Sequence, residues 1–132
     1  MKNKQKSPGL VPDIKYLNIP NICFSLLSKG DDREIEYSKQ RIQRGFDDSE
    51  TWSLTDTICR FILPRLSRFK ECSQGIPHGL NQDDWYLILD KMILTFNLIC
   101  RDNGIRIWSE HESKQIDEGL NLFKERFLAL WW

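Results

Sequence analysis

The strongest pattern of apolar residues lies between residues 50 and 70. Ser53 is followed three residues later by Asp56, a weak form of the capping box that predicts a helix start near Leu54. The next apolar residues recur at helical spacing and predict one buried face: Leu54, Ile58, Phe61, Ile62, Leu66 and Phe69. Pro64 lacks an N–H and disturbs a helix at this point. Because the apolar spacing continues past Pro64, we expect one kinked helix rather than two.

Two further stretches carry helical patterns. One begins at Asn81, ends at Asn103-Gly104 and is apolar on two faces, which predicts a central helix contacted from more than one side. The other begins at a full S-x-x-E capping box, Ser109 to Glu112. Gly119 lies inside this last helix and indicates a close crossing with another helix, because glycine there is otherwise destabilising. The apolar residues of the last helix are Ile116, Leu120, Phe123, Phe127 and Leu130.

The N-terminal third is less regular. Residues 1–12 are lysine-rich with few apolar side chains and are expected to form a flexible basic tail. Residues 13–29 fit a short helix or a strand, and residues 33–44 fit a short, mostly exposed helix capped by Gly45. The pattern therefore predicts an all-α protein with a single helical domain over residues 13–132. We expect a compact bundle of three long helices, the first kinked at Pro64, plus one or two short N-terminal helices.

The balance of charge argues against two classes of partner. The 132 residues carry 19 basic and 19 acidic side chains, so no global field attracts nucleic acid or an anionic membrane. The longest apolar run, Tyr86 to Cys100, is interrupted by polar residues and is shorter than a membrane span. The four cysteines show no paired spacing and are interpreted as reduced thiols. We therefore expect a cytoplasmic protein that binds neither membrane nor nucleic acid.

No motif in the sequence indicates catalysis or a cofactor. His78 and His111 are far apart and no cysteine pair supports them, so we expect no metal site. Phosphate-binding glycine loops and nucleophile motifs are absent from the sequence. We expect no catalytic residues and no cofactor, and an enzyme acting on a nucleotide is the least favoured interpretation.

A cluster of arginines around Trp52 is the candidate ligand site. Arginine forks suit phosphate or carboxylate, a tryptophan can stack on a base, and a helix start offers free N–H groups. The candidate residues for an anion or nucleotide are Arg41, Arg44, Trp52, Ser53, Asp56 and Arg65. Two alternatives stay open. The arginines can instead pair within the chain with Asp47, Asp48 and Glu50, and Trp52 alone is more typical of a core residue.

The C-terminus ends on large apolar side chains where a surface terminus is usually polar. Phe127, Trp131 and Trp132 either cover the core or form a subunit contact. We take them as the candidate interface of a homo-oligomer.

Residues 40–132 resemble a family of small, uncharacterised proteins encoded by tailed bacteriophages. The resemblance rests on the order and spacing of several blocks: Arg44-Gly-Phe46, Thr51-Trp-Ser-Leu54, Phe61-Ile-Leu-Pro-Arg-Leu66, Phe69-Lys-Glu71, Trp85 with Ile88-Leu-Asp-Lys-Met-Ile93, Ile116-Asp-Glu-Gly-Leu120 with Leu122-Phe123, and Leu130-Trp131. Members usually carry an aspartate after Thr-Trp-Ser-Leu, whereas here Thr55 takes that position and Asp56 follows it. The resemblance implies a phage product acting in the host bacterial cytoplasm.

Taken together, these features predict a non-catalytic binding protein. We expect it to counter host defence by sequestering a small anionic or nucleotide ligand or by inhibiting a host bacterial protein. The alternative is an accessory protein of the virion or of its assembly with a purely structural role.

Overall fold

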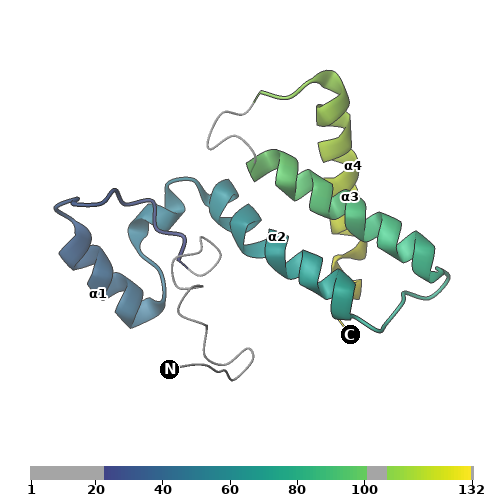
Figure 1. Cartoon of the computed structure of the whole chain (residues 1–132), viewed down its shortest axis with the longest axis horizontal. Helices are drawn as coiled ribbons and strands as arrows, with labels where there is room; N and C mark the ends of the chain where they lie inside the picture. The colour runs from purple at the N-terminus through teal and green to yellow at the C-terminus, as the bar shows by residue number, and fades with distance from the viewer. Residues whose placement is uncertain (1–22, 101–106, 132) are drawn as a thin grey trace, which may run out of the picture. The chain divides into compact units, whose positions relative to one another are not determined.

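The computed structural model describes residues 23–100 and 107–131, and this part of the chain is all helical (Figure 1). It contains the α-helices α1 (Glu34–Arg44), α2 (Leu54–Cys72), α3 (Gln82–Cys100) and α4 (Glu110–Arg126). Two 3₁₀-helices accompany them, η2 (Asp48–Thr51) and η3 (Phe127–Ala129). The all-α prediction is confirmed. The predicted tail over residues 1–12 and Trp132 lie outside the described residues.

The chain divides into two compact units, and the boundary between them along the chain falls inside α2, between Arg60 and Phe61. Each unit is described by itself below. The expectation of one domain over residues 13–132 stays a prediction.

In the first unit, α1 is the short, exposed helix that the sequence predicts. Glu34 and Glu36 lie in its first turn and Arg41 and Arg44 in its last, which complements the helix dipole at both ends. Gly45 adopts a φ of 88° and its N–H donates to the Arg41 carbonyl at 2.8 Å, so it closes the helix as expected. No residue of α1 is buried. Residues 23–28 form no helix. The earlier part of the predicted short helix or strand over residues 13–29, up to residue 22, lies outside the described residues.

Helix α2 begins at Leu54, as predicted, and continues through Pro64 without interruption. The alternative of two separate helices is therefore wrong. At its start, the Thr57 hydroxyl donates to the Glu50 carbonyl at 2.6 Å, which ties α2 to the preceding η2. The bend at Pro64 stays a prediction.

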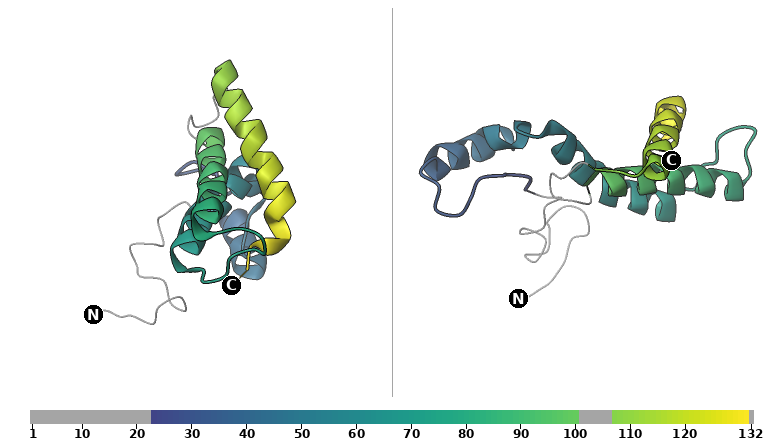
Figure 2. Two further views of the ribbon diagram at one scale, coloured as in Figure 1. Left: turned by 90° about the vertical axis from the view of Figure 1, so that its right-hand side faces the viewer. Right: turned by 90° about the horizontal axis from the view of Figure 1, so that it is seen from above.

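In the second unit, α4 packs on α3 and lies across it (Figures 1 and 2). Both helix starts are capped as the sequence predicts. The Asn81 side chain accepts from the Asp84 N–H at 2.8 Å, and Ser109 and Glu112 form a complete capping box. The buried side of α3 consists of Trp85, Leu89, Met92, Thr95, Phe96 and Leu98.

α3 and α4 approach each other closely at Gly119. A Cβ added there would lie 1.7 Å from Thr95 Oγ1 and 2.8 Å from the Lys91 carbonyl oxygen, so no larger residue fits without movement. The close crossing expected from the sequence is confirmed. Just before α4, the Trp108 indole donates to the Leu98 carbonyl of α3 at 3.0 Å.

Candidate functional site

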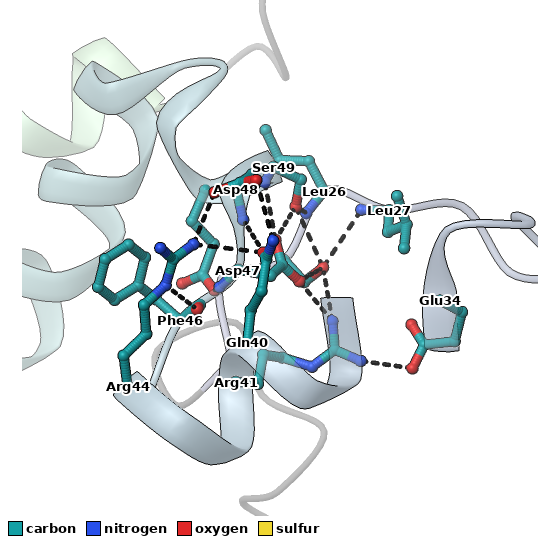
Figure 3. A network of polar contacts seen from close by, with 12 residues as sticks. Leu26, Leu27, Glu34, Gln40, Arg41, Arg44, Phe46, Asp47, Asp48 and Ser49 are labelled. Carbon is teal, nitrogen blue, oxygen red and sulfur yellow. Dashed lines mark hydrogen bonds and ion pairs between the residues drawn. The ribbon is translucent and has the colours of Figure 1, made fainter. Parts of the chain in front are cut away.

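A network of polar contacts around Asp47 organises the first unit (Figure 3). The Asp47 side chain is 0% exposed. Its Oδ2 accepts from the Ser25 hydroxyl at 2.6 Å and forms an ion pair with Arg41. Its Oδ1 accepts from the backbone N–H of Ser49 at 2.8 Å and from the Ser49 hydroxyl at 2.5 Å. Buried charge is tolerated when it is paired and fully hydrogen-bonded, and Asp47 meets that condition.

The same network fixes two neighbouring segments. The Asp47 backbone N–H donates to Glu50 Oε2 at 2.8 Å, which completes a capping box at the start of η2. The Ser49 hydroxyl oxygen accepts from the Leu26 N–H at 2.7 Å. Asp47 and Ser49 therefore hold the otherwise irregular residues 23–28 against the turn between α1 and α2.

Hydrogen bonds set the protonation state of Asp47. Burial by itself raises the pKa of this carboxyl, but hydrogen bonds from Ser25, Ser49 and Arg41 outweigh burial and hold the pKa below its ordinary value. For Arg41, burial lowers the pKa, and its contacts with Asp47 and Glu34 outweigh that effect and raise it. The pair is therefore an ionised aspartate and an ionised arginine at neutral pH.

Arg41 and Arg44 both have carboxylate partners within the chain. The Arg41 guanidinium lies between Asp47 and Glu34 and pairs with both (Figure 3). Arg44 pairs with Asp48 at 2.6 Å, donates to the Phe46 carbonyl at 3.1 Å, and lies 4.3 Å from the centre of the Phe46 ring. The structure therefore shows these arginines paired with Asp47 and Asp48, which is the alternative of intramolecular pairing that the sequence left open. An anion at either guanidinium has to compete with these partners.

Trp52 lies at the surface rather than in the core. It is 50% exposed, so its interpretation as a core residue is wrong. The Arg33 guanidinium lies 5.0 Å from the centre of the Trp52 ring, and the Tyr37 ring is tilted against it with centres 6.3 Å apart. The indole is thus packed under a cation and beside another ring, both from the α1 region.

Sequence reasoning did not find Arg33. The sequence pattern places it only as the first residue of the predicted helix over residues 33–44, and in the structure it lies one residue before α1. Arg33 also pairs with Asp31 at 2.8 Å, and hydrogen bonds from the Arg33 side chain and backbone lower the pKa of Asp31 to about 2. A basic residue one helical turn before Tyr37 is the only sequence signal of this stack.

The other three candidates are distributed over α2 and its start. The Ser53 hydroxyl donates to Asp56 Oδ2 at 2.9 Å, so these two residues lie together at the start of α2. Arg65 belongs to the second unit, where it donates to the Phe61 carbonyl at 2.9 Å and lies 4.0 Å from the centre of the Phe61 ring. The first unit thus contains five of the six candidates and the second unit contains Arg65.

A group of exposed apolar side chains follows α4, which we call the C-terminal surface: Phe127, Leu128 and Trp131. Phe127 is 57% and Trp131 is 74% exposed. Phe127 is connected to the core through ring contacts, since Phe123 packs edge-on against both Phe127 and Phe96. Phe127 is therefore anchored to the core of the second unit, and the C-terminal surface is not covered by that core.

Residues 23–100 and 107–131 contain neither a metal-ligand cluster nor a membrane-spanning helix. No group of three or more histidine, cysteine, aspartate or glutamate side chains in this part can hold a metal ion. None of its helices is long and apolar enough to cross a membrane. The four cysteines are free thiols.

No protein-family model matches this chain, and no curated protein or solved structure matches it at a significant level. The resemblance to phage proteins therefore stays an expectation from the sequence.

Proposed function

We propose that this chain is a non-catalytic, phage-encoded binding protein that self-associates. It acts in the host bacterial cytoplasm, where it contacts a host protein and so counters host defence. The observation that carries the proposal is the C-terminal surface, whose large apolar side chains are exposed on the single chain. Large exposed apolar side chains that gather in one part of a protein often mark contacts with other proteins. The phage origin and the cytoplasmic location rest on the resemblance over residues 40–132.

A second copy of the chain is the first partner we assign to this surface. Aromatic side chains dominate the energetics of protein interfaces, and Phe127 and Trp131 are the aromatic members here. The ring contact of Phe127 with Phe123 connects Phe127 to the core and reduces the ordering cost of association. In this proposal the three long helices form one bundle, bent at Pro64, that serves as the scaffold for the surface.

Light scattering tests the self-association. The full-length chain is expected to be an oligomer, and a variant carrying both Phe127→Ser and Trp131→Ser is expected to be a monomer. Ile42→Ser is the matched control, because Ile42 is also a largely exposed apolar residue, at 82%, and lies on α1 in the first unit. An unchanged mass for the double variant, or a monomeric wild type, overturns this part of the proposal.

Mass spectrometry of purified phage particles separates a host-directed protein from a virion component. A protein that acts on the host is expected to be absent from the particles or present only in traces. Stoichiometric amounts in the particle favour the structural role instead.

A nucleotide or other small anion near Trp52 is the second candidate function, and the exposed indole ring favours it. Arg33 already lies over that ring, so a base either displaces Arg33 or stacks on the opposite face. A thermal-shift screen with cyclic and linear nucleotides, repeated on Trp52→Ala, tests this candidate. Stabilisation of the wild type that is lost in Trp52→Ala supports it, and no stabilisation at millimolar nucleotide rejects it.

An enzyme acting on a nucleotide is the least favoured function. It requires turnover that Asp56→Ala or Arg44→Ala abolishes. Asp56 accepts from Ser53 and Arg44 pairs with Asp48, so both side chains already have structural partners.

A further inference from the structure

A cavity of about 290 Å³ lies in the second unit, between the last turn of α2, the loop that follows and the first turns of α3. A molecule of liquid water takes about 30 Å³, so the cavity has room on the scale of roughly ten non-hydrogen atoms, the size of one large aromatic side chain. Its wall includes exposed residues of the loop and of the start of α3, which place it at the surface of the unit: Gln74, Gly75, Ile76 and Gln82.

Trp131 of the C-terminal surface lies beside this cavity without lining it. A Cβ added to Gly75, which is part of the cavity wall, would lie 3.8 Å from the Trp131 carbonyl oxygen. The Trp131 side chain does not contribute to the wall, and the residue is 74% exposed. A large exposed aromatic ring and a cavity of matching size therefore lie next to each other on one chain.

The chemistry of the cavity wall suits an indole ring. The Lys70 ammonium pairs with Asp90 at 2.7 Å and lies 5.2 Å from the centre of the Tyr86 ring. Tryptophan is the aromatic side chain that attracts a cation best, and Tyr86 adds a second ring for aromatic contact. The Gln82 amide donates to the Tyr86 hydroxyl at 3.1 Å and also carries an acceptor oxygen, which suits an indole N–H because that group only donates. Ile76, which is 44% exposed, supplies an apolar part of the wall.

The position of Trp131 beside the cavity determines which copy of the ring can enter it. In a two-fold symmetric dimer the same patch of both copies forms the interface, so a side chain and the site that receives it have to lie on the same face. Trp131 and the cavity meet this condition. We infer that the Trp131 side chain of each copy enters the cavity of the other copy, so that a closed dimer contains this contact twice. Tryptophans seated in pockets are typical of the residues that dominate interface energetics.

This inference rests on the self-association in the proposed function and adds the site that receives the ring. The two ideas fail in different ways. A monomeric wild type overturns self-association and the reciprocal contact together. An oligomeric wild type that is insensitive to blocking the cavity overturns only the reciprocal contact.

Blocking the cavity from within the chain is the first test. Gln74→Trp places a ring at the cavity wall and is expected to weaken self-association at least about 30-fold, as the loss of a dominant interface contact does. His78→Trp is the matched control, because His78 is an exposed residue of the same loop and does not line the cavity. Sedimentation equilibrium measures the dissociation constants. Equal association of Gln74→Trp and the wild type overturns the inference.

Mixing two variants tests whether the contact is reciprocal. Trp131→Ser keeps the cavity and loses the ring, whereas Gln74→Trp keeps the ring of Trp131 and loses the cavity. At a concentration at which each variant alone is monomeric, an equimolar mixture is expected to contain heterodimers, because one ring still finds an open cavity. A mixture that stays monomeric contradicts the exchange of rings.

Photo-cross-linking keeps the test decisive if Gln74→Trp fails to fold. The full chain with p-benzoylphenylalanine in place of Trp131 is mixed with ¹⁵N-labelled wild type and irradiated, and mass spectrometry identifies the cross-linked peptides. Cross-links from position 131 to residues 70–89 of the labelled copy are expected, because this range contains the cavity wall. The absence of cross-links to these labelled residues overturns the inference.

Discussion

Gly119 of α4 lies directly against Thr95 of α3, with no room for a side chain between them. The Thr95 hydroxyl donates to the Gln115 carbonyl at 3.0 Å, so it bonds to the same helix that Gly119 brings close. A Cβ on residue 119 would lie 1.7 Å from Thr95 Oγ1. This contact fixes how closely α3 and α4 approach.

Gly119→Ala is therefore expected to destabilise the protein by about 2–3 kcal/mol, the cost of overpacking a close contact. The sign of this change in stability is informative, because alanine in an ordinary helix interior is about 1 kcal/mol more favourable than glycine. Urea unfolding measures the difference. Gly75→Ala is the control, since a Cβ there meets only the Trp131 carbonyl oxygen at 3.8 Å. Equal stability of Gly119→Ala and the wild type would show that the helices separate easily.

The helix boundaries could be predicted from the sequence because their signals are local. The Ser109 capping box, the Asn81 cap and Gly45 each act within one turn, so short-range patterns identify them. Gly119 was interpretable for a related reason, since a glycine inside a strong helix pattern requires an explanation from packing. What the sequence could not give is the partner, because Thr95 comes from a different helix.

Asp47→Asn tests the buried network of the first unit. The amide cannot accept all the hydrogen bonds that the carboxylate accepts, and it leaves Arg41 without its buried counter-charge. We expect a loss of about 2 kcal/mol or more, typical of breaking one side of a buried pair. Asp48→Asn is the matched control, because the Asp48–Arg44 pair is exposed to solvent and should contribute much less. Similar losses for both variants would contradict the special position of Asp47.

The pH dependence of stability follows from the same carboxylate. The pKa of Asp47 is lower in the folded chain than the ordinary value of about 3.9, so below that pH the unfolded chain binds more protons. The contribution of Asp47 is therefore complete above about pH 5 and is lost as the pH falls through about 3.9 toward its folded pKa. Unfolding free energies at a series of pH values check this.

Other carboxyls contribute to the same acid response, so the comparison has to be made between variants. The pKa of Asp48 is lowered by hydrogen bonds from Arg44 and Gln40, and that of Asp31 by Arg33. Asp47→Asn is expected to reduce the slope of stability against pH below about pH 4 without removing it. A slope identical to that of the wild type would mean that Asp47 does not change its pKa on folding.

The contacts of the candidate ligand site could be predicted from the sequence only in part. The sequence left open the pairing of Arg41 and Arg44 with nearby carboxylates as an alternative to the ligand site, and the structure shows these arginines paired with Asp47 and Asp48. The full burial of Asp47 could not be predicted, because it depends on Ser25, which lies far away in the sequence. The exposure of Trp52 under Arg33 was missed for the same reason, since residues before α1 supply the contact.

Ser109→Ala provides a test of a feature that the sequence predicts completely. The Ser109 hydroxyl accepts from the Glu112 N–H at 3.1 Å, and the Glu112 side chain accepts from the Ser109 N–H at 3.0 Å. Removing the hydroxyl is expected to cost about 1 kcal/mol of unfolding free energy, because one N–H at the helix start loses its partner. Ser113→Ala, one turn later on the exposed side of the same helix, should be neutral or slightly stabilising. α4 carries both the Gly119 contact and the connection to the C-terminal surface. Equal unfolding free energies for the two serine variants would mean that α4 is stabilised by its packing on α3 rather than by its own cap.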